Sequence, residues 1–337
     1  MKALVLHNHE PFLRFEDVPT PTPQHGEAQI RLQSASLNHR DEWIRRGQYA
    51  RIQYPAILGS DGAGIVECVG NPDDASWIGK EVIISPSSGW GRSESAQHPK
   101  DYSVLGMPSQ GTFAEYIVVP LDRLHIKPPH LSMDEASALP LAGLTAYRAV
   151  VTQGEITATS KVLITGIGGG VAQYALQFAR AHGAEVWVTS GSDEKLIRAK
   201  ELGAKGGVNY QLSDWHTRLL EQAGEFDVVI DSVCGDHMNL LIETLRYGGR
   251  YVFFGATLGK PTNLNVQRIF WKQIRLQGTT MGSDHEFERM IAMVSAHTIV
   301  PMIDSVIPLA NGEEAFRVMH KTQQFGKIVL RINSPHE

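Results

Sequence analysis

The chain has 337 residues, a length typical of about two domains. It carries 31 Lys and Arg against 36 Asp and Glu, giving a formal net charge of −5, with 42% hydrophobic and 20% charged residues. These values argue against a disordered or fibrous chain, and the absence of a long basic run gives no footprint for nucleic acid or an anionic membrane. The two cysteines, Cys68 and Cys234, are too few for a disulfide framework or a four-cysteine zinc cluster.

The sequence predicts neither a signal peptide nor a membrane span. The apolar run after Met1 ends at the polar residues 7–10, which is too early for a signal peptide. Residues 162–179 are uncharged, but they include four glycines together with Gln173 and Gln177, and a membrane helix needs a more continuous apolar run of about 20 residues. We therefore expect a soluble, cytoplasmic protein.

The first 125 residues or so predict an all-β domain. Short segments with alternating or β-branched patterns are separated by turns rich in Pro and Gly. One short helix is expected at 41–47. The predicted strands are residues 1–7, 28–37, 62–70, 80–85 and 113–119.

Beyond Pro128 and Pro129, helices and strands alternate. Ser132 and Glu135 form a capping-box pattern, which predicts a long apolar helix running toward Val151. Alternation of this kind implies right-handed βαβ units, and so a doubly wound parallel sheet. The predicted strands are residues 161–165, 184–189, 226–231 and 250–254. The predicted helices are residues 171–182 and 193–202, with a further helical stretch between the last two strands. The chain closes with helices near 286–296 and 312–319 and a strand at 327–332.

A glycine-rich loop is the strongest local motif. The sequence Thr165-Gly-Ile-Gly-Gly-Gly-Val-Ala172 follows an apolar strand and opens a helix, which is the context of a dinucleotide-binding loop. Glycine lets the backbone approach a pyrophosphate closely, and the helix N-terminus offers free N–H groups to the anion. The run ends in Ala172 where the strict motif has Gly, and a small residue is accepted there. The residues predicted to bind the cofactor here are Gly168, Gly169, Gly170 and Val171.

The end of the next strand favours NADP over NAD. An NAD site places Asp or Glu there to bind the ribose hydroxyls, whereas this strand ends with Ser190, Gly191 and Ser192, and Asp193 is the first acid. Lys195 would attract a 2′-phosphate, with the hydroxyls of Ser190 and Ser192 as neutral donors. The alternative is that Lys195 is a solvated helix residue.

Several further motifs, in this order, resemble the medium-chain dehydrogenase/reductase superfamily, and within it the zinc-free quinone oxidoreductase-like branch. The resemblance runs nearly end to end and implies a Rossmann domain at 127–269 that binds NADP, and a GroES-like β-rich catalytic domain at 1–126 completed by about 270–337. The motifs are Met-Lys-Ala at residues 1–3, Ser-Leu-Asn-His-Arg-Asp at 36–41, Pro-Ala-Ile-Leu-Gly-Ser-Asp-Gly-Ala-Gly at 55–64, Gly-Thr-Phe-Ala-Glu-Tyr at 111–116, Gly-Leu-Thr-Ala-Tyr at 143–147, the glycine loop, and Phe-Gly-Ala-Thr at 254–257.

The resemblance also bears on metal binding. Zinc alcohol dehydrogenases of the superfamily bind catalytic zinc through Cys, His, an adjacent Glu and a second Cys. The matching positions here hold Asn38, the pair Ser60-Asp61, and Leu141, and the matching structural-zinc lobe, about residues 85–108, has no cysteine. Amide, hydroxyl and leucine side chains do not make a tetrahedral zinc site, so no metal is expected.

Without a Lewis acid to activate an alcohol, the resemblance implies hydride transfer from NADPH to a small-molecule electrophilic acceptor, a quinone or an α,β-unsaturated carbonyl. Catalytic candidates are Asn38, Asp41 and Trp43, the last at a position where relatives often have Tyr; the alternative for Trp43 is a core aromatic. A homodimer is implied. Alternatives are an NADPH-binding sensor or structural protein with little turnover, and a zinc-type alcohol dehydrogenase.

The resemblance further assigns residues to the cofactor. Lys195 and Tyr210 match residues that contact the 2′-phosphate in NADPH-dependent relatives. Thr145 matches a residue on the nicotinamide side, and Gly255 and Thr257 lie on the strand end that passes over it. Cys234 follows a predicted strand, where we expect a buried, inert thiol.

Overall fold

The computed structural model describes residues 1–332 and divides into two compact units. The first unit holds residues 1–142 and the described residues from 283 onward, and the second holds residues 143–282. Each unit is described by itself.

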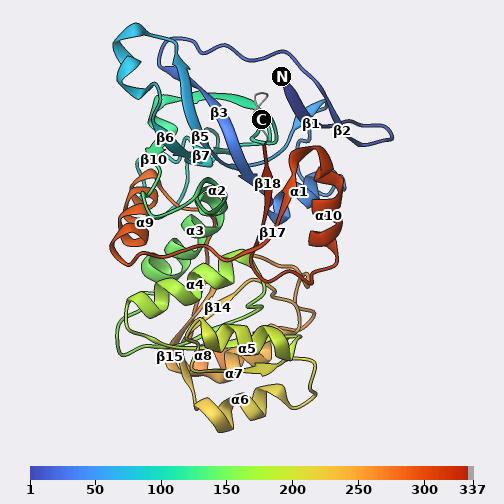
Figure 1. Ribbon diagram of the computed structural model, residues 1–337. Coiled ribbons are helices and arrows are strands. Elements are labelled where there is room, and N and C mark those ends of the chain that lie inside the picture. The colour runs from blue at the N-terminus through green and yellow to red at the C-terminus, as the bar shows by residue number, and fades with distance from the viewer. Residues whose placement is uncertain (333–337) are drawn as a thin grey trace. The chain divides into compact units, whose positions relative to one another are not determined.

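The first unit is built on β-sheets that are antiparallel except for the parallel pair β17 and β18, and they join early and late parts of the chain. Its main sheet has the order β10-β6-β5-β3-β18-β17, with β9 also pairing with β3. Strand β18, near the C-terminus, lies beside β3 (Figure 1). The strands of this sheet are β3 (Glu27–Ser36), β5 (Asp61–Val69), β6 (Glu81–Ile84), β9 (Tyr116–Pro120), β10 (Leu124–Ile126), β17 (Ile303–Pro308) and β18 (Lys327–Arg331).

Smaller elements complete this unit. A second sheet has the order β2-β1-β4, and β7 pairs with β8. The core joins distant parts of the chain, because Phe113 and Phe316 are fully buried with ring centroids 6.3 Å apart. The elements are β1 (Lys2–Leu6), β2 (Leu13–Asp17), β4 (Ala56–Ile57), β7 (Ser87–Ser88), β8 (Ser103–Val104), α1 (His39–Arg45), α2 (Met133–Ala138), α9 (Asp284–Ala296) and α10 (Gly312–His320).

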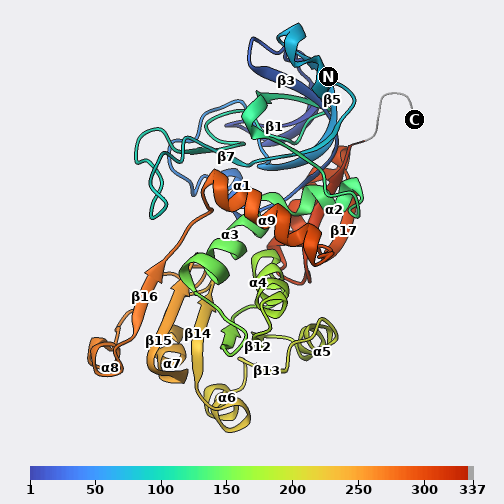
Figure 2. The same ribbon diagram turned by 90° about the vertical axis from the view of Figure 1, so that its left-hand side faces the viewer.

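The second unit is a parallel sheet of the order β13-β12-β11-β14-β15-β16. Numbered along this unit, that order is 3-2-1-4-5-6, which is the Rossmann arrangement. Figure 2 shows β14, β15 and β16 side by side. The elements are β11 (Lys161–Ile164), β12 (Glu185–Ser190), β13 (Gly206–Asn209), β14 (Phe226–Asp231), β15 (Leu245–Phe253), β16 (Arg275–Gly278), α4 (Gly170–Ala181), α5 (Asp193–Glu201), α6 (Trp215–Ala223), α7 (His237–Thr244) and α8 (Val266–Trp271).

The predicted fold class is therefore confirmed: a β-rich unit and a doubly wound parallel sheet. The predicted single helix toward Val151 is wrong. Its capping box at Ser132 is present, but α2 ends at Ala138 and α3 (Pro140–Tyr147) begins at a proline, followed by a π-helical turn at Arg148–Gln153. Proline has no backbone N–H to donate to the preceding turn, so the helix breaks there.

The unit boundaries also differ from the expected 126/127 and 269/270. Helix α2 packs on β3 and β5, so residues up to 142 belong to the first unit. Strand β16 pairs with β15, so residues up to 282 belong to the second. Both shifts follow from packing partners that are distant in the sequence.

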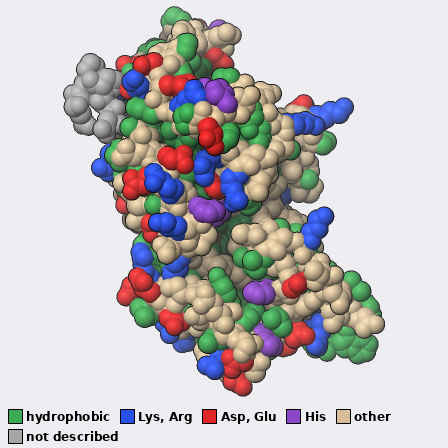
Figure 3. Space-filling model, turned by 90° about the vertical axis from the view of Figure 1, so that its right-hand side faces the viewer, with side chains coloured by type: hydrophobic (Ala, Val, Ile, Leu, Met, Phe, Trp, Pro, Cys, Tyr) green, Lys and Arg blue, Asp and Glu red, His purple; other side chains and the backbone are tan. Residues whose placement is uncertain are grey.

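The uncharged stretch at 162–179 forms most of β11, the glycine loop and most of α4 rather than one helix. Within residues 1–332, no helix is long and apolar enough to cross a membrane. On the face shown in Figure 3, Lys and Arg side chains are interspersed with Asp and Glu and form no continuous basic patch.

Candidate functional site

Asn38 lies in the first unit at the junction of β3 and α1. It is the N-cap of α1 and has extended backbone angles. Its backbone N–H donates to Asp41 Oδ2 over 2.8 Å, and Asp41 Oδ1 accepts the Gly59 N–H over 3.3 Å. Asp41 is fully buried, and this burial raises its pKa to about 6, although the Arg40 charge opposes the shift. Both oxygens of Asp41 thus accept backbone N–H groups, one from the N-cap of α1 and one from Gly59 between β4 and β5.

The Asn38 side chain belongs to a buried cluster with Asp61 and Lys327. Asn38 Nδ2 donates to Asp61 Oδ2 over 2.8 Å, and Lys327 Nζ donates to Asn38 Oδ1 over 2.7 Å. Lys327 also donates to Asp61 Oδ2 over 3.1 Å and to the Leu37 carbonyl over 2.7 Å. Lys327 is 4% exposed, Asn38 7%, and Asp61 0%. We call Asn38, Asp61 and Lys327 the lysine cluster.

The sequence predictions missed Lys327. It is the first residue of β18 and lies 289 positions from Asn38. Only the antiparallel pairing of β18 with β3 brings the two together. The available signal was a lysine directly before the apolar residues 328–330 of the closing strand.

The residues at the positions matched to zinc ligands do not fit a zinc ion. Asp61 Oδ1 accepts the Leu141 backbone N–H over 2.8 Å, while its Oδ2 is bound to Lys327 and Asn38. Ser60 Oγ accepts from Arg40 over 2.6 Å and donates to a backbone carbonyl. Residues 1–332 contain no group of three or more His, Cys, Asp and Glu that could hold a metal ion. A tetrahedral site needs nitrogen, sulfur or free carboxylate ligands, and these positions supply none.

Trp43 is 36% exposed, so its interpretation as a core aromatic is wrong. It is on α1, with its ring centroid 6.4 Å from that of His39. Its indole is therefore available to a ligand at the surface of the first unit.

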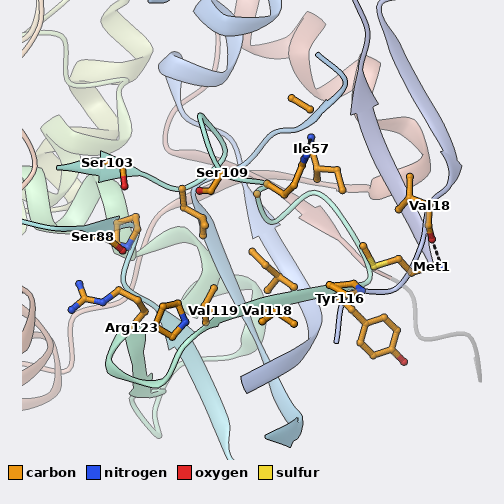
Figure 4. Close-up of a pocket in the computed structure, with 18 of the residues that line it drawn as sticks. Met1, Val18, Ile57, Ser88, Ser103, Ser109, Tyr116, Val118, Val119 and Arg123 are labelled. Atoms are coloured by element: carbon orange, nitrogen blue, oxygen red, sulfur yellow. Dashed lines mark hydrogen bonds between the residues drawn. The ribbon is translucent and has the colours of Figure 1, made fainter. Parts of the chain in front are cut away.

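A separate cavity of about 480 Å³ lies in the first unit and does not include the lysine cluster. Its lining is mostly apolar, with Met1, Val18 and Val119 among the residues labelled in Figure 4. Arg123 lines it too, but its guanidinium is bound by the Asp284 carboxylate over 2.5 and 2.9 Å. The cavity therefore carries no free charge from this arginine.

In the second unit, the glycine loop connects β11 to α4. Gly166 has φ +62°, a left-handed conformation that favours glycine, and Gly169 is the N-cap of α4. A Cβ atom added at either glycine would meet no other atom closer than 3.5 Å, so the backbone of the loop is not crowded. The side chain of Gln173, in the first turn of α4, is buried, and neither of its polar atoms has a partner within the described residues. Open glycine backbone, free helix N–H groups and an unpaired buried amide fit a dinucleotide pyrophosphate. The remaining predicted loop residues, Gly168, Gly170 and Val171, lie in the same turn.

The residues expected at the 2′-phosphate lie together at the carboxyl edge of β12 and β13. Ser192 caps α5, and its Oγ accepts the Lys195 N–H over 3.4 Å. Ser190 Oγ accepts the Ser192 N–H over 3.1 Å. A Cβ atom on Gly191 would lie 2.9 Å from the Tyr210 hydroxyl, so the Tyr210 ring lies against this turn. Lys195 is half-buried rather than fully solvated.

Asp193, the first acid after β12, is already engaged. Its Oδ1 accepts from Asn209 Nδ2 over 2.9 Å. This contact ties the carboxylate to the end of β13. The same turn carries the hydroxyl groups of Ser190 and Ser192 and the side chain of Lys195.

Of the residues expected on the nicotinamide side, Gly255 and Thr257 follow β15, and Thr145 lies on α3. A Cβ on Gly255 would lie 2.7 Å from the Ser232 carbonyl, which also accepts from Thr257 Oγ1 over 3.2 Å. Thr145 is buried, and its Oγ1 lies 3.8 Å from Met281 Sδ. Gly255 and Thr257 thus lie beside Ser232.

Two further groups lie at the end of β14. Cys234 is buried, its Sγ donates to the Gly255 carbonyl over 3.0 Å, and burial raises its pKa to about 11, which agrees with an inert thiol. Asp231, which the sequence predictions did not single out, is fully buried and accepts from Thr165 Oγ1 over 2.6 Å and from the Tyr251 hydroxyl over 2.5 Å. Asp231 therefore ties the glycine loop to β14 and β15.

Comparisons with known proteins bear on both units. A family model described as alcohol dehydrogenase GroES-like domain matches residues 24–129, and one described as zinc-binding dehydrogenase matches residues 170–296.

Three curated relatives span nearly the whole chain. A zinc-type alcohol dehydrogenase-like protein YogA of Leptosphaeria maculans is 35% identical over 95% of this chain and 94% of its own length. An acryloyl-coenzyme A reductase of Sulfurisphaera tokodaii is 28% identical over 98% of this chain and 100% of its length. A quinone oxidoreductase of Mus musculus is 27% identical over 94% of this chain and 92% of its length.

A solved structure has the same fold. It is titled as an NAD-dependent alcohol dehydrogenase, and it superposes with a TM-score of 0.92 at 34% identity, covering 99% of this chain and 100% of the other.

Proposed function

The chain belongs to the medium-chain dehydrogenase/reductase superfamily of oxidoreductases, and we propose that it is a zinc-independent reductase. Its reaction transfers a hydride from NADPH to an electrophilic acceptor, a quinone or an α,β-unsaturated carbonyl compound. The observation that carries this proposal is the lysine cluster, in which Asn38 and Asp61 stand at positions matched to catalytic zinc ligands and are bound by Lys327.

The cluster limits which reactions are feasible. Alcohol oxidation in zinc enzymes depends on a metal that lowers the pKa of the hydroxyl. In the lysine cluster the only cation is the Lys327 ammonium, which is already bound to three oxygens. An acceptor that is electrophilic by itself needs orientation, exclusion of water and a hydrogen-bond donor for the oxygen that gains charge. The amide of Asn38 supplies such a donor without adding a charge.

The second unit fits NADPH, which supplies the hydride when it is bound. In this proposal the backbone of Gly168, Gly169 and Gly170 and the N-terminus of α4 hold the pyrophosphate. At the other end of the binding edge, Lys195 and Tyr210 bind the 2′-phosphate with Ser190 and Ser192. The nicotinamide lies beside Thr145, Gly255 and Thr257 in this proposal.

Two of the relatives support the acceptor class by their names. Acryloyl-coenzyme A is an α,β-unsaturated thioester and a quinone is a conjugated diketone, so both accept hydride without prior activation by a metal. The Leptosphaeria relative is named a zinc-type alcohol dehydrogenase-like protein, which points to the opposite reaction. The experiment therefore has to compare reduction of quinones and enones with oxidation of alcohols.

The test compares both directions on one preparation. NADPH oxidation is followed at saturating cofactor with a panel of quinones and enones, and NADP⁺ or NAD⁺ reduction is followed with a panel of primary and secondary alcohols. We expect turnover with at least one quinone or enone, the enone giving the saturated ketone, and none with alcohols. Turnover with alcohols alone would refute the proposal, and tight NADPH binding without any turnover would favour a sensor.

The exposed edge of the second unit supports a homodimer. Strand β16 ends the sheet, with β15 as its partner, and all four of its residues are exposed. Just before it, α8 exposes Val266, Phe270 and Trp271 at 60%, 66% and 70%. An open strand edge beside large exposed apolar side chains is a surface that a second copy can cover.

A further inference from the structure

The orientation of the Asn38 amide is fixed by its neighbours. An ammonium group only donates hydrogen bonds, and an ionised carboxylate only accepts them. Lys327 Nζ lies 2.7 Å from one end of the amide, and Asp61 Oδ2 lies 2.8 Å from the other. The amide oxygen must therefore face Lys327 and the NH2 group must face Asp61. The reverse orientation would place oxygen against carboxylate and NH2 against ammonium.

The lysine cluster fixes this orientation, because every N–H donor of the Lys327 ammonium group is already used. Lys327 has three N–H donors, and they meet three acceptors: the Leu37 carbonyl, Asn38 Oδ1 and Asp61 Oδ2. Asp61 accepts in addition from Ser36 Oγ over 3.2 Å and from the Leu141 backbone N–H over 2.8 Å. Both charged groups are buried, so water does not compete for them.

One N–H of Asn38 remains. The NH2 group has two donors, and one is used by Asp61. The other makes no hydrogen bond within residues 1–332, and Asn38 retains 7% of its surface exposed. The donor left over in the cluster is therefore an N–H of the amide, while the amide oxygen is held by Lys327.

We propose that Lys327 is a positioning residue that acts on the reaction through Asn38, by holding the amide with its free N–H ready to donate to the acceptor oxygen. This inference rests on the proposed function. When hydride from NADPH forms a C–H bond at the β-carbon of an enone, the π electron pair moves onto the carbonyl oxygen and NADP⁺ is left. A proton from solvent then completes the product at the α-carbon. The Asn38 N–H stabilises the oxygen while it carries the negative charge.

A double-mutant cycle between Lys327 and Asn38 tests the coupling. Lys327→Met and Asn38→Ala are each expected to lower kcat with an enone about 100-fold, because the donor is misplaced or lost. The NADPH Kd is expected to stay at the wild-type value in both. The double variant should show no loss beyond either single variant. A double variant whose loss of kcat equals the product of the two single losses would overturn the proposal. A Lys327→Met enzyme with wild-type kcat would overturn it as well.

A second set of variants separates positioning from folding. Lys327→Met leaves the Asp61 carboxylate buried and unpaired, which is strongly destabilising by itself. In Lys327→Met/Asp61→Asn that lone charge is gone, so the Tm should recover while kcat stays low. Recovery of kcat together with the Tm would show a purely structural role and overturn the proposal.

The matched control is Lys272→Met in the second unit. Lys272 is 5% exposed and pairs with Glu225 over 3.1 Å, so its loss also lowers the Tm, but kcat per folded molecule should stay at the wild-type value. A wild-type enzyme that is inactive with every acceptor would refute the proposed function. An active wild type whose Lys327→Met variant keeps full kcat would refute only the role of Lys327.

Discussion

Replacing Lys195 by alanine removes the one charge that we assign to the 2′-phosphate of NADPH. Lys195 lies in the first turn of α5, where the capping hydroxyl of Ser192 accepts its backbone N–H. Tyr210 lies against the same turn, while the carboxylate of Asp193 is tied to Asn209. The substitution therefore changes the charge at this edge without disturbing the cap or introducing an acid.

The size of the effect follows from the strength of a charged hydrogen bond. Losing one costs about 1.5–3 kcal/mol, which is a roughly 10- to 150-fold rise in the Kd for NADPH at about 1.4 kcal/mol per tenfold. Lys195 is half-buried, and solvent screening places the expected value toward the lower end of this range. NADH lacks the phosphate, so its Kd should not change.

The assay is a fluorescence titration of wild type, Lys195→Ala and Lys200→Ala with NADPH and with NADH. Lys200 is an exposed lysine on the same helix and serves as the matched control. We expect a weaker NADPH affinity in Lys195→Ala alone. An unchanged NADPH Kd in that variant, or equal weakening for both cofactors, would show that Lys195 does not bind the phosphate.

Three other predictions concern stability and assembly. Burial raises the folded-state pKa of Asp41 from 3.8 to about 6, so between these pH values the folded state binds more protons than the unfolded state, and stability falls as pH rises by at most about 3 kcal/mol. In urea unfolding, the free energy of unfolding of the wild type minus that of Asp41→Asn should therefore be lower at pH 7 than at pH 4. An equal value at the two pH values would contradict this prediction. A Cβ at Gly64 would lie 2.2 Å from the Arg31 carbonyl, so Gly64→Ala should cost about 1–3 kcal/mol or more in urea unfolding, whereas an unchanged midpoint would mean that the strands can separate. Trp271→Glu should convert a homodimer to monomers in sedimentation velocity, and a wild type that is monomeric at all concentrations would refute the dimer.

Much of the fold could be predicted because its signals are local. The alternating patterns at 28–37 and 62–70 lead to β3 and β5, and the apolar segment before the glycine loop leads to β11. Strand β13 was missed because its first two residues, Gly206 and Gly207, have no side chain to show a pattern. Strand β16 was missed because it is exposed throughout, so burial leaves no pattern in its sequence.

The candidate site also has a part that could be predicted from local sequence and a part that could not. The glycine loop and the turn that holds Ser190, Ser192 and Lys195 are contiguous segments, so their residue types and order predict the chemistry. The lysine cluster is assembled from three distant strand ends, and the partners of Asn38 could be identified only from the pairing of β3 with β5 and β18. Asp41 was expected to be catalytic because it lies in the matching motif, and only the geometry shows that its carboxylate accepts the backbone N–H groups of Asn38 and Gly59.

The central claim is hydride transfer to an electrophilic acceptor without zinc. The most direct measurement is kcat for NADPH-dependent reduction of an enone or quinone, on enzyme treated with a chelator and dialysed, with the zinc content of the same sample determined by mass spectrometry. The account predicts unchanged kcat at a zinc content far below one per chain, and no gain when zinc is added back. Activity that disappears with the chelator and returns in proportion to bound zinc would contradict it.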